Sequence, residues 1–292
     1  ATDGAGSGAV VYEMDDLELA GNLTVAGVLD VDGTANLDVI DVDGAANFAA
    51  DVTFADGADI ITASAGTSNV RIGVNAGNSI ASGGNYNVVV GDEAGTALTT
   101  GTDNTFVGSN AGDALIDSDH NTAIGHQSLT ADTKGSKSTA VGAFSLNAQN
   151  FTTATDSFNT AVGYVAGGAV TTGTNNTLIG GLAGDAITTG AGNTGLGKNA
   201  LGATTTASAN TAVGTNAMLS NTEGANNVAV GHQALDSDTL GSKTVAVGKN
   251  TLQSQNFTTA TDSFNTAVGY DAGQAVTTGI HNTLIGGLAG DA

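Results

Sequence analysis

The sequence contains no cysteine, no proline and no tryptophan, and only 4% of its residues are aromatic. The absence of cysteine excludes a disulfide framework. The shortage of aromatic residues argues against the compact core that a chain of 292 residues would ordinarily build. Glycine is abundant instead, with 44 copies. Small residues suit a thin interior, one side chain deep, between closely stacked backbones.

Positive charge is also scarce, because 6 Lys and Arg stand against 28 Asp and Glu, for a net charge of −22. A chain without a basic patch cannot neutralise phosphates, so nucleic acid is excluded as a partner and an anionic membrane surface is disfavoured. No apolar run approaches the length of a membrane-spanning helix. The sequence starts at Ala1, and its last repeat stops six residues after its glycine. We therefore expect both ends to be cuts in a longer polypeptide.

The dominant feature is a pentad, Asn-Thr-Ala-Val-Gly or a close variant, that recurs thirteen times. Nine of the twelve spacings are 17 residues, one is 18 and two are 21. A fixed period this short predicts a solenoid with one coil per repeat, because each coil can bury its apolar face only against its neighbours. The closing glycines are Gly73, Gly91, Gly108, Gly125, Gly142, Gly163, Gly180, Gly197, Gly214, Gly231, Gly248, Gly269 and Gly286.

Each position of the pentad, counted from 1 to 5, has its own chemistry. Position 1 is Asn except at Ser138 and Thr244, position 2 is Thr or Val, and position 4 is Val, Ile or Leu. Positions 2 and 4 share one face of a strand, and we expect that face to fill the interior. Position 3 would then point outward, towards a partner chain. The constant glycine at position 5 indicates a positive φ or a close backbone approach.

Residues 1–68 differ from residues 69–292. The first region carries thirteen acidic residues and no Lys or Arg, and its short alternating runs are separated by glycines. Such runs predict short strands joined by tight turns, which form an acidic β-strand shaft or attachment segment. The second region is the solenoid, with thirteen coils of which the last is truncated. The predicted fold class is therefore all-β, a parallel β-solenoid or β-roll of about 17 residues per coil preceded by a β-strand shaft.

A longer repeat is superposed on the coils. The stretch NFTTATDSFNTAVGY occupies residues 150–164 and recurs unchanged at residues 256–270. Both copies contain the four extra residues of a 21-residue coil, which we expect to project as a wider loop. Aromatic rings beside Asn and Gln suit carbohydrate binding, although packing onto the neighbouring coil is the alternative. The candidate ligand-contact residues are Phe151, Phe158, Phe257 and Phe264.

Residues 159–164, with the sequence NTAVGY, and residues 121–129, with NTAIGHQSL, resemble the repeats of tail-fibre-like proteins of tailed bacteriophages. The pattern is also similar to the head repeats of trimeric autotransporter adhesins, although those repeats are shorter. The opening residues 1–12 and the run at residues 21–27 resemble shaft segments of phage fibres. The resemblance covers nearly the whole chain. Nothing in the sequence resembles the self-cleaving chaperone domain that ends many such fibres.

The resemblance implies a homotrimeric structural fibre of a virion, a rigid spacer that supports attachment to a host surface. The implied partners are further copies of the chain, other virion tail proteins and a host cell-surface glycan. The second alternative, ranked below the virion fibre, is a bacterial trimeric surface adhesin, located on the cell surface. A self-assembling extracellular filament remains a third alternative.

We expect no enzymatic activity and no cofactor, because no catalytic constellation stands out from the repeat. His126 and His232 lie six coils apart, too far to share a zinc ion. Structural calcium is disfavoured because the nine-residue period of calcium-binding solenoids is absent; the acidic N-terminal region, with Asp30, Asp32, Asp41 and Asp43, is the better place for it. An ice-binding array of threonines is disfavoured, since the position-2 threonines are expected to share the interior face with Val and Ile.

Overall fold

The computed structural model describes residues 65–291. The proposed shaft therefore lies almost entirely outside the described residues, and so do the four calcium candidates Asp30, Asp32, Asp41 and Asp43. The described residues form strands, turns and bends and contain no helix. Among them, accordingly, no apolar helix is long enough to span a bilayer.

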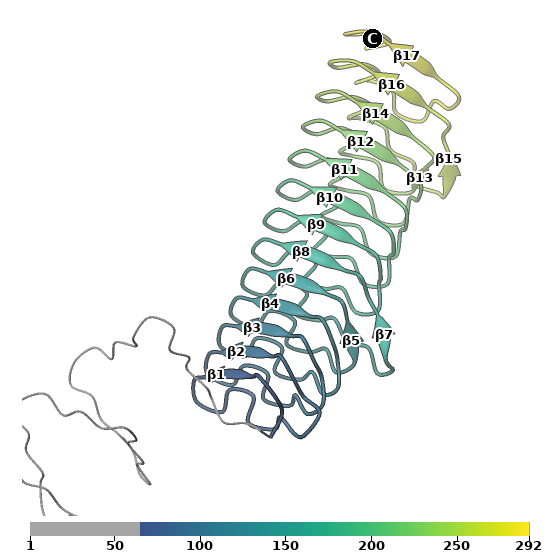
Figure 1. The fold of residues 1–292 in the computed structure, drawn as a ribbon. Helices are drawn as coiled ribbons and strands as arrows, with labels where there is room; N and C mark the ends of the chain where they lie inside the picture. Colours follow the sequence, from purple (N-terminus) through teal and green to yellow (C-terminus); the bar gives the residue numbers. More distant parts are fainter. Residues whose placement is uncertain (1–64, 292) are drawn as a thin grey trace, which may run out of the picture. The chain divides into compact units, whose positions relative to one another are not determined.

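Figure 1 shows the strands as rungs of one long stack. Each pentad supplies one strand of three residues, and the other four strands have two residues each. The strands are β1 (Val70–Ile72), β2 (Val88–Val90), β3 (Thr105–Val107), β4 (Thr122–Ile124), β5 (Gly135–Ser136), β6 (Thr139–Val141), β7 (Thr155–Asp156), β8 (Thr160–Val162), β9 (Thr177–Ile179), β10 (Thr194–Leu196), β11 (Thr211–Val213), β12 (Val228–Val230), β13 (Gly241–Ser242), β14 (Val245–Val247), β15 (Thr261–Asp262), β16 (Thr266–Val268) and β17 (Thr283–Ile285).

The thirteen pentad strands form a single parallel sheet in sequence order, β1-β2-β3-β4-β6-β8-β9-β10-β11-β12-β14-β16-β17. The register runs from pentad to pentad, so that Thr194 lies opposite Thr211 and Leu196 opposite Val213. The remaining strands form two small parallel pairs, β5 with β7 and β13 with β15. The predicted parallel β-solenoid of about 17 residues per coil is confirmed. We number the coils 1 to 13, each starting at position 1 of its pentad.

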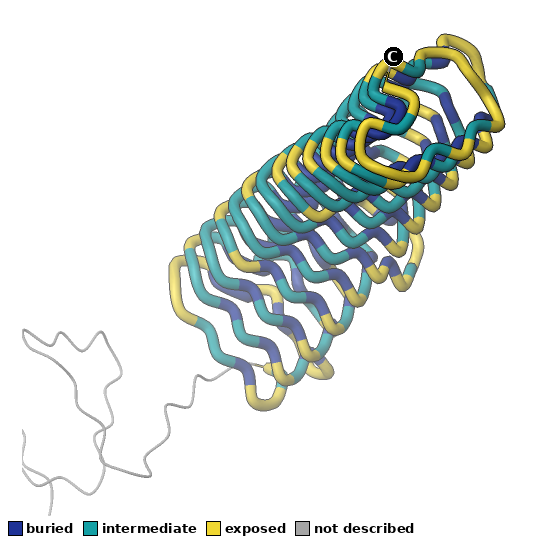
Figure 2. Tube along the Cα trace, turned by 90° about the horizontal axis from the view of Figure 1, so that it is seen from above, coloured by how far each residue is buried: buried dark blue, intermediate teal, exposed yellow. Residues whose placement is uncertain are grey.

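The prediction of which strand face lies inside is wrong. Position 3 is fully buried from coil 2 to coil 12, for example at Phe106 and Leu178, while positions 2 and 4 are half-buried or exposed (Figure 2). At the ends of the stack, Ile72 is 57% exposed and Ile285 is 70% exposed. Alternation along a strand explains the outcome, because the buried Asn at position 1 and the residue at position 3 must share a face. The β-branched residues at positions 2 and 4 therefore point outward.

The side chains at positions 3 and 9 fill the interior together, and where one is large the other is small. We call this relation the volume trade. Where position 3 is large, as at Phe106, position 9 is glycine; a Cβ on Gly112 would lie 2.9 Å from the Phe106 ring. Where position 3 is Ala or Gly, position 9 is a long residue, as with Ala212 and Met218. Each coil thus encloses a similar volume, which close packing demands. Coils 6 and 12 are exceptions in which both positions are small, and the leucines of the two neighbouring coils fill the space in each.

Position 9 carries a conformational constraint that explains this trade. The backbone there is left-handed in every coil, with φ of 60° at Leu201 and 51° at Met218. This conformation costs an L residue with a side chain about 1–2 kcal/mol. Glycine is therefore the natural occupant, and Leu or Met is used where its side chain must fill the core.

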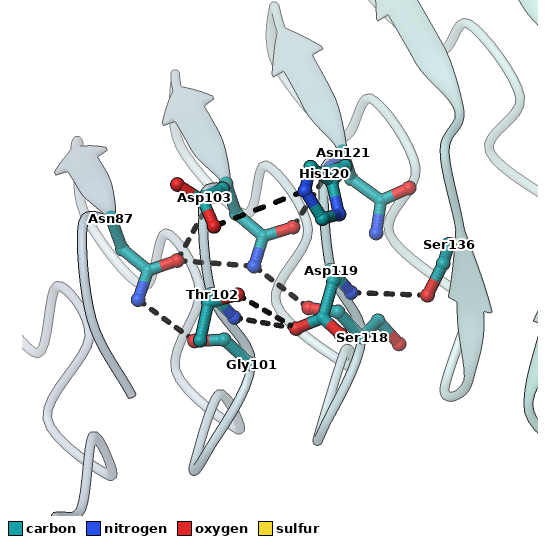
Figure 3. Close-up of polar contacts among 10 residues, drawn as sticks. Asn87, Gly101, Thr102, Asp103, Ser118, Asp119, His120, Asn121 and Ser136 are labelled. Atoms are coloured by element: carbon teal, nitrogen blue, oxygen red, sulfur yellow. Dashed lines mark hydrogen bonds and ion pairs between the residues drawn. The ribbon is translucent and has the colours of Figure 1, made fainter. Parts of the chain in front are cut away.

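A ladder of buried asparagines joins the coils on the inside of the corner (Figure 3). The Oδ1 atom of Asn87 accepts a hydrogen bond of 3.0 Å from the backbone N–H of Asn104 in the next coil. The Nδ2 atom of Asn87 donates a hydrogen bond of 2.9 Å to the carbonyl of Gly101, which lies near the end of the same coil. The same pair of bonds recurs along most of the stack. Each position-1 Asn thus satisfies backbone groups that would otherwise be buried without partners.

A second ladder is made by the glycines at position 5. Their φ values lie between 128° and 142°, a region that favours glycine. A Cβ built on Gly180 would lie 2.5 Å from the carbonyl oxygen of Gly197 in the next coil. The backbones of successive coils therefore approach too closely for any side chain. This approach accounts for glycine from Gly73 to Gly269, and at Gly286, where a Cβ would meet nothing within 4 Å, the positive φ alone favours glycine.

The glycine ladder predicts a sharp contrast between two adjacent residues. Gly180→Ala should destabilise the protein by about 3 kcal/mol or more, because the clash is with backbone and the φ is unfavourable. Gly181→Ala is the control, since a Cβ there meets nothing within 4 Å, and its effect should stay within about 0.5 kcal/mol. Thermal and denaturant unfolding of both variants measures the difference. Equal stability of the two would refute the close-approach argument.

The volume trade predicts compensation in coil 8. Leu201→Gly should destabilise by about 2–3 kcal/mol, because the cavity outweighs the relief of backbone strain. Gly195→Leu should also destabilise, by about 1–3 kcal/mol, since the new side chain would crowd Leu201. The double variant recreates the pairing of Leu178 with Gly184 in coil 7 and should lie within about 1 kcal/mol of the wild type. Additive losses in a double-mutant cycle would contradict this expectation.

Candidate functional site in the two wide coils

Coils 5 and 11 have 21 residues and depart from the regular stack. Coil 5 spans residues 138–158, and its extra residues carry strand β7, which pairs with β5 of the preceding coil. Coil 11 spans residues 244–264 and repeats the arrangement with β15 and β13. Figure 1 shows both small pairs along the same side of the stack. The predicted wider loops are therefore present, and each one is tied back to the coil before it.

A buried polar network holds the first wide coil. Asp132 is fully buried; its Oδ1 accepts from the backbone N–H groups of Gly135 at 2.9 Å and Phe151 at 3.1 Å. Its Oδ2 accepts from the Nε2 of Gln149 at 2.6 Å. The Oε1 of Gln149 in turn accepts from the Nδ2 of Asn159 at 2.8 Å. A buried carboxylate with this many donors is well compensated for its loss of hydration.

This network explains why Ser138 and Thr244 replace asparagine at position 1. Gln149 donates to the hydroxyl of Ser138 at 2.8 Å, and that hydroxyl also meets the hydroxyl of Ser157. The glutamine thus occupies the interior beside a shorter position-1 side chain. In coil 11, Gln255 makes the corresponding bonds to Asp238 at 2.6 Å and to Thr244 at 3.1 Å. Sequence reasoning missed this network, although the 17-residue spacing from Asp132 to Gln149 and from Asp238 to Gln255 could have indicated it.

The structure separates the four candidate phenylalanines into two pairs. Phe151 and Phe257 are each only 6% exposed. Phe158 is 52% exposed and Phe264 is 48% exposed. Ligand contact at Phe158 and Phe264 stays a prediction, whereas the buried pair has little ring surface to offer.

Each exposed ring lies beside a lysine and an aspartate, and we call these two groups the ledges. On the first ledge, the Lys137 Nζ is 5.3 Å from the ring centroid of Phe158 and 2.5 Å from the Oδ2 of Asp156. On the second, the Lys243 Nζ is 5.2 Å from the ring centroid of Phe264. It also lies 2.6 Å from Asp262, and the ring of His281 stacks on Phe264. An exposed ring flanked by charged groups can contact the apolar face of a sugar while those groups hydrogen-bond its hydroxyls.

The histidines do not form a metal site. The ring of His126 packs edge-on against Phe144, with 5.1 Å between centroids, and Phe144 packs likewise against Tyr164. The Nε2 of His120 is 3.9 Å from the carboxylate of Asp103 (Figure 3). Within residues 65–291, no group of three or more His, Asp or Glu side chains is placed to hold a metal ion.

A shallow groove lies on a different side of the coils. It has a volume of about 450 Å³ and is lined by Asp185, Asn199, Gly202, Ala203, Leu219 and Ser220. The lack of a side chain at Gly202, between Asp185 and Leu219 in the same column, opens the groove.

Burial raises the pKa of the Asp185 carboxyl, and a backbone hydrogen bond opposes that shift. Burial likewise raises the pKa of the Asp236 carboxyl, and the electrostatic interaction with His232 opposes that rise. No second feature indicates a ligand here.

Comparison with known proteins adds no relative. No family model matches the chain, and neither a curated protein nor a solved structure is significantly similar to it. The fold and the two ledges are therefore the basis of any functional proposal.

The buried network predicts that Gln149 is essential to the first wide coil. Gln149→Leu should destabilise by about 2–3 kcal/mol, because it leaves the buried Asp132 carboxylate without its side-chain donor. Gln127→Leu is the matched control, since Leu182 holds the equivalent position in coil 7 and the side chain is only half-buried. Denaturant unfolding compares the two. A change of less than about 0.5 kcal/mol in Gln149→Leu would show that the network is dispensable.

Proposed function

We propose that this chain is a structural fibre protein of a virion, a rigid homotrimeric spacer that supports attachment to a host surface. The observation that carries the proposal is the unbroken parallel sheet of thirteen strands in constant register. Strands stacked about 4.8 Å apart make a rod close to 60 Å long from this region alone. A rod of this kind spans distance efficiently and encloses little volume for a catalytic cavity.

Stiffness follows from the bonds between coils. Each coil is joined to the next by backbone hydrogen bonds and by the close glycine approach, and most coils are joined by the asparagine ladder as well. Bending the rod would break these contacts, which recur along the stack. A chain stabilised only by contacts between neighbouring repeats can also be lengthened by adding coils. Both properties suit a spacer.

The proposed partners are further copies of the chain, other tail proteins of the virion and a host cell-surface glycan. The exposed rings of Phe158 and Phe264 are a part of the described surface that suits a glycan. A bacterial trimeric surface adhesin is the alternative that the ledges also fit, since it would present the same rings from a cell surface. Antibody against residues 65–291 would label tail fibres on purified particles under the first proposal and bacterial cells under the second.

The trimeric state is tested by the mass of the chain in solution. Light scattering across a dilution series should give a stable mass near three times 28.2 kDa. Electron microscopy of the same sample should show uniform rods. A monomeric mass at all concentrations would contradict the homotrimer, and open-ended polymers would favour the self-assembling filament instead.

A further inference from the structure

The outward face of the large sheet consists of two continuous columns of side chains. The position-2 column contains only Thr and Val, and the position-4 column only Val, Ile and Leu. The position-2 residues are Val70, Val88, Thr105, Thr122, Thr139, Thr160, Thr177, Thr194, Thr211, Val228, Val245, Thr266 and Thr283. The position-4 residues are Ile72, Val90, Val107, Ile124, Val141, Val162, Ile179, Leu196, Val213, Val230, Val247, Val268 and Ile285. We call these two columns the outer face.

The outer face bears no charge, although the chain has a net charge of −22. Charged residues lie in other outward columns, for example Asp92, Lys198 and Lys249 directly after the position-5 glycines. Copies of so acidic a chain repel one another over most of their surface. The outer face is a strip through which two copies can approach without bringing like charges together.

The threonine hydroxyls of the outer face are unused within the chain. Nine of the thirteen position-2 residues are threonine, and within residues 65–291 none of these hydroxyls is hydrogen-bonded to another residue of the chain. Threonines elsewhere in the coil behave differently: Thr171 and Thr188 each donate to a carbonyl of the next coil, at 3.1 and 3.2 Å. The position-2 hydroxyls are therefore left to water or to a partner.

The dimensions of the outer face match an interface. Twelve strand spacings of about 4.8 Å and a width of three residues give a strip of roughly 58 by 10 Å, on the order of 600 Å². That area is of the same order as the roughly 800 Å² that each partner buries in a stable complex. Apolar strips of such length on soluble proteins usually mark interaction sites.

We propose that the outer face binds second copies of this chain, parallel and in register, so that each coil meets its own counterpart. The proposal rests on the homotrimeric fibre proposed above and identifies its contact surface. A second copy is the partner whose side chains repeat at the same spacing and carry no charge on the same strip. Position 3, which the sequence suggested as the interface, is buried inside each chain and cannot serve.

The order of Thr and Val along the position-2 column favours the parallel arrangement. Val occupies position 2 in coils 1, 2, 10 and 11, and Thr occupies it elsewhere. In a parallel, in-register trimer with the position-2 column against the threefold axis, Val meets Val and Thr meets Thr at every level. In a fully overlapped antiparallel pair, coil 3 would meet coil 11, which sets Thr105 against Val245. Each of the four valines would then face a threonine, and the hydroxyl of that threonine would be buried without a partner.

Single cysteines test both the face and the direction, because the chain has no cysteine of its own. The variants are Thr105→Cys in coil 3, Thr177→Cys in the middle coil 7 and Thr266→Cys in coil 12. Oxidation, or a short bis-maleimide where the sulfurs are too far apart for a disulfide, should shift most of each variant from 28.2 kDa to twice that mass on a denaturing gel. Thr206→Cys, exposed but away from the outer face, is the control and should stay at the single-chain mass.

The outcomes separate the interface from the fibre proposal. Linkage at Thr177→Cys alone indicates antiparallel pairing and overturns the parallel arrangement. A trimeric mass with linkage only at Thr206→Cys overturns the outer face as the interface while leaving the trimeric spacer intact. Linkage at all three outer-face positions in a particle of only two chains supports the interface and overturns the trimer. A monomer in which no variant is cross-linked overturns self-association. The outer face would then be free to bind another regular surface, such as ice.

Discussion

The close approach of successive backbones at the position-5 glycines is the constraint on which the rest of the structure depends. The carbonyl of one glycine occupies the place that a Cβ of the preceding one would need, so the corner of every coil that is followed by another must be glycine. This corner fixes the spacing of the coils and, with it, the strand register. Once the register is fixed, every residue type falls into a column, and each column has a single environment along the stack. The asparagine ladder and the volume trade between positions 3 and 9 both rely on that regularity.

The period of the pentad was sufficient to predict the solenoid, because a short apolar motif at a fixed spacing indicates repeats that bury their apolar faces against one another. The assignment of faces failed for an identifiable reason. Val and Ile at position 4 were placed inside because apolar β-branched residues are usually buried. The solenoid interior, however, is too thin for such residues on every coil, and it is filled by Ala from position 3 and Leu from position 9. The pairing of Phe106 with Gly112 and of Ala212 with Met218 was visible in the sequence and would have indicated position 3 as the inner one.

The wide coils show where pattern reasoning reached its limit. The four extra residues predicted a projecting loop and drew attention to its phenylalanines, but the sequence did not separate the buried rings from the exposed ones. Phe151 and Phe257 are buried because their backbone N–H groups bind the carboxylates of Asp132 and Asp238 inside the coil. That requirement depends on a network across two coils, which a single-coil pattern does not reveal. The exposed rings of Phe158 and Phe264 are left at the edge of this network, held by it and open to solvent.

Hydrogen exchange measured residue by residue tests the stacked-coil account most directly. From Gly91 to Gly286, every position-5 amide donates to the position-4 carbonyl of the preceding coil, as Gly214 does to Leu196 at 2.7 Å. These amides should exchange slowly at every level of the stack, near the limit set by global unfolding. The amides of the exposed Thr172, Thr189 and Thr206 should exchange rapidly in the same experiment, giving a protection pattern with the period of the coil. Fast exchange at the position-5 glycines, or protection without that period, would contradict the account.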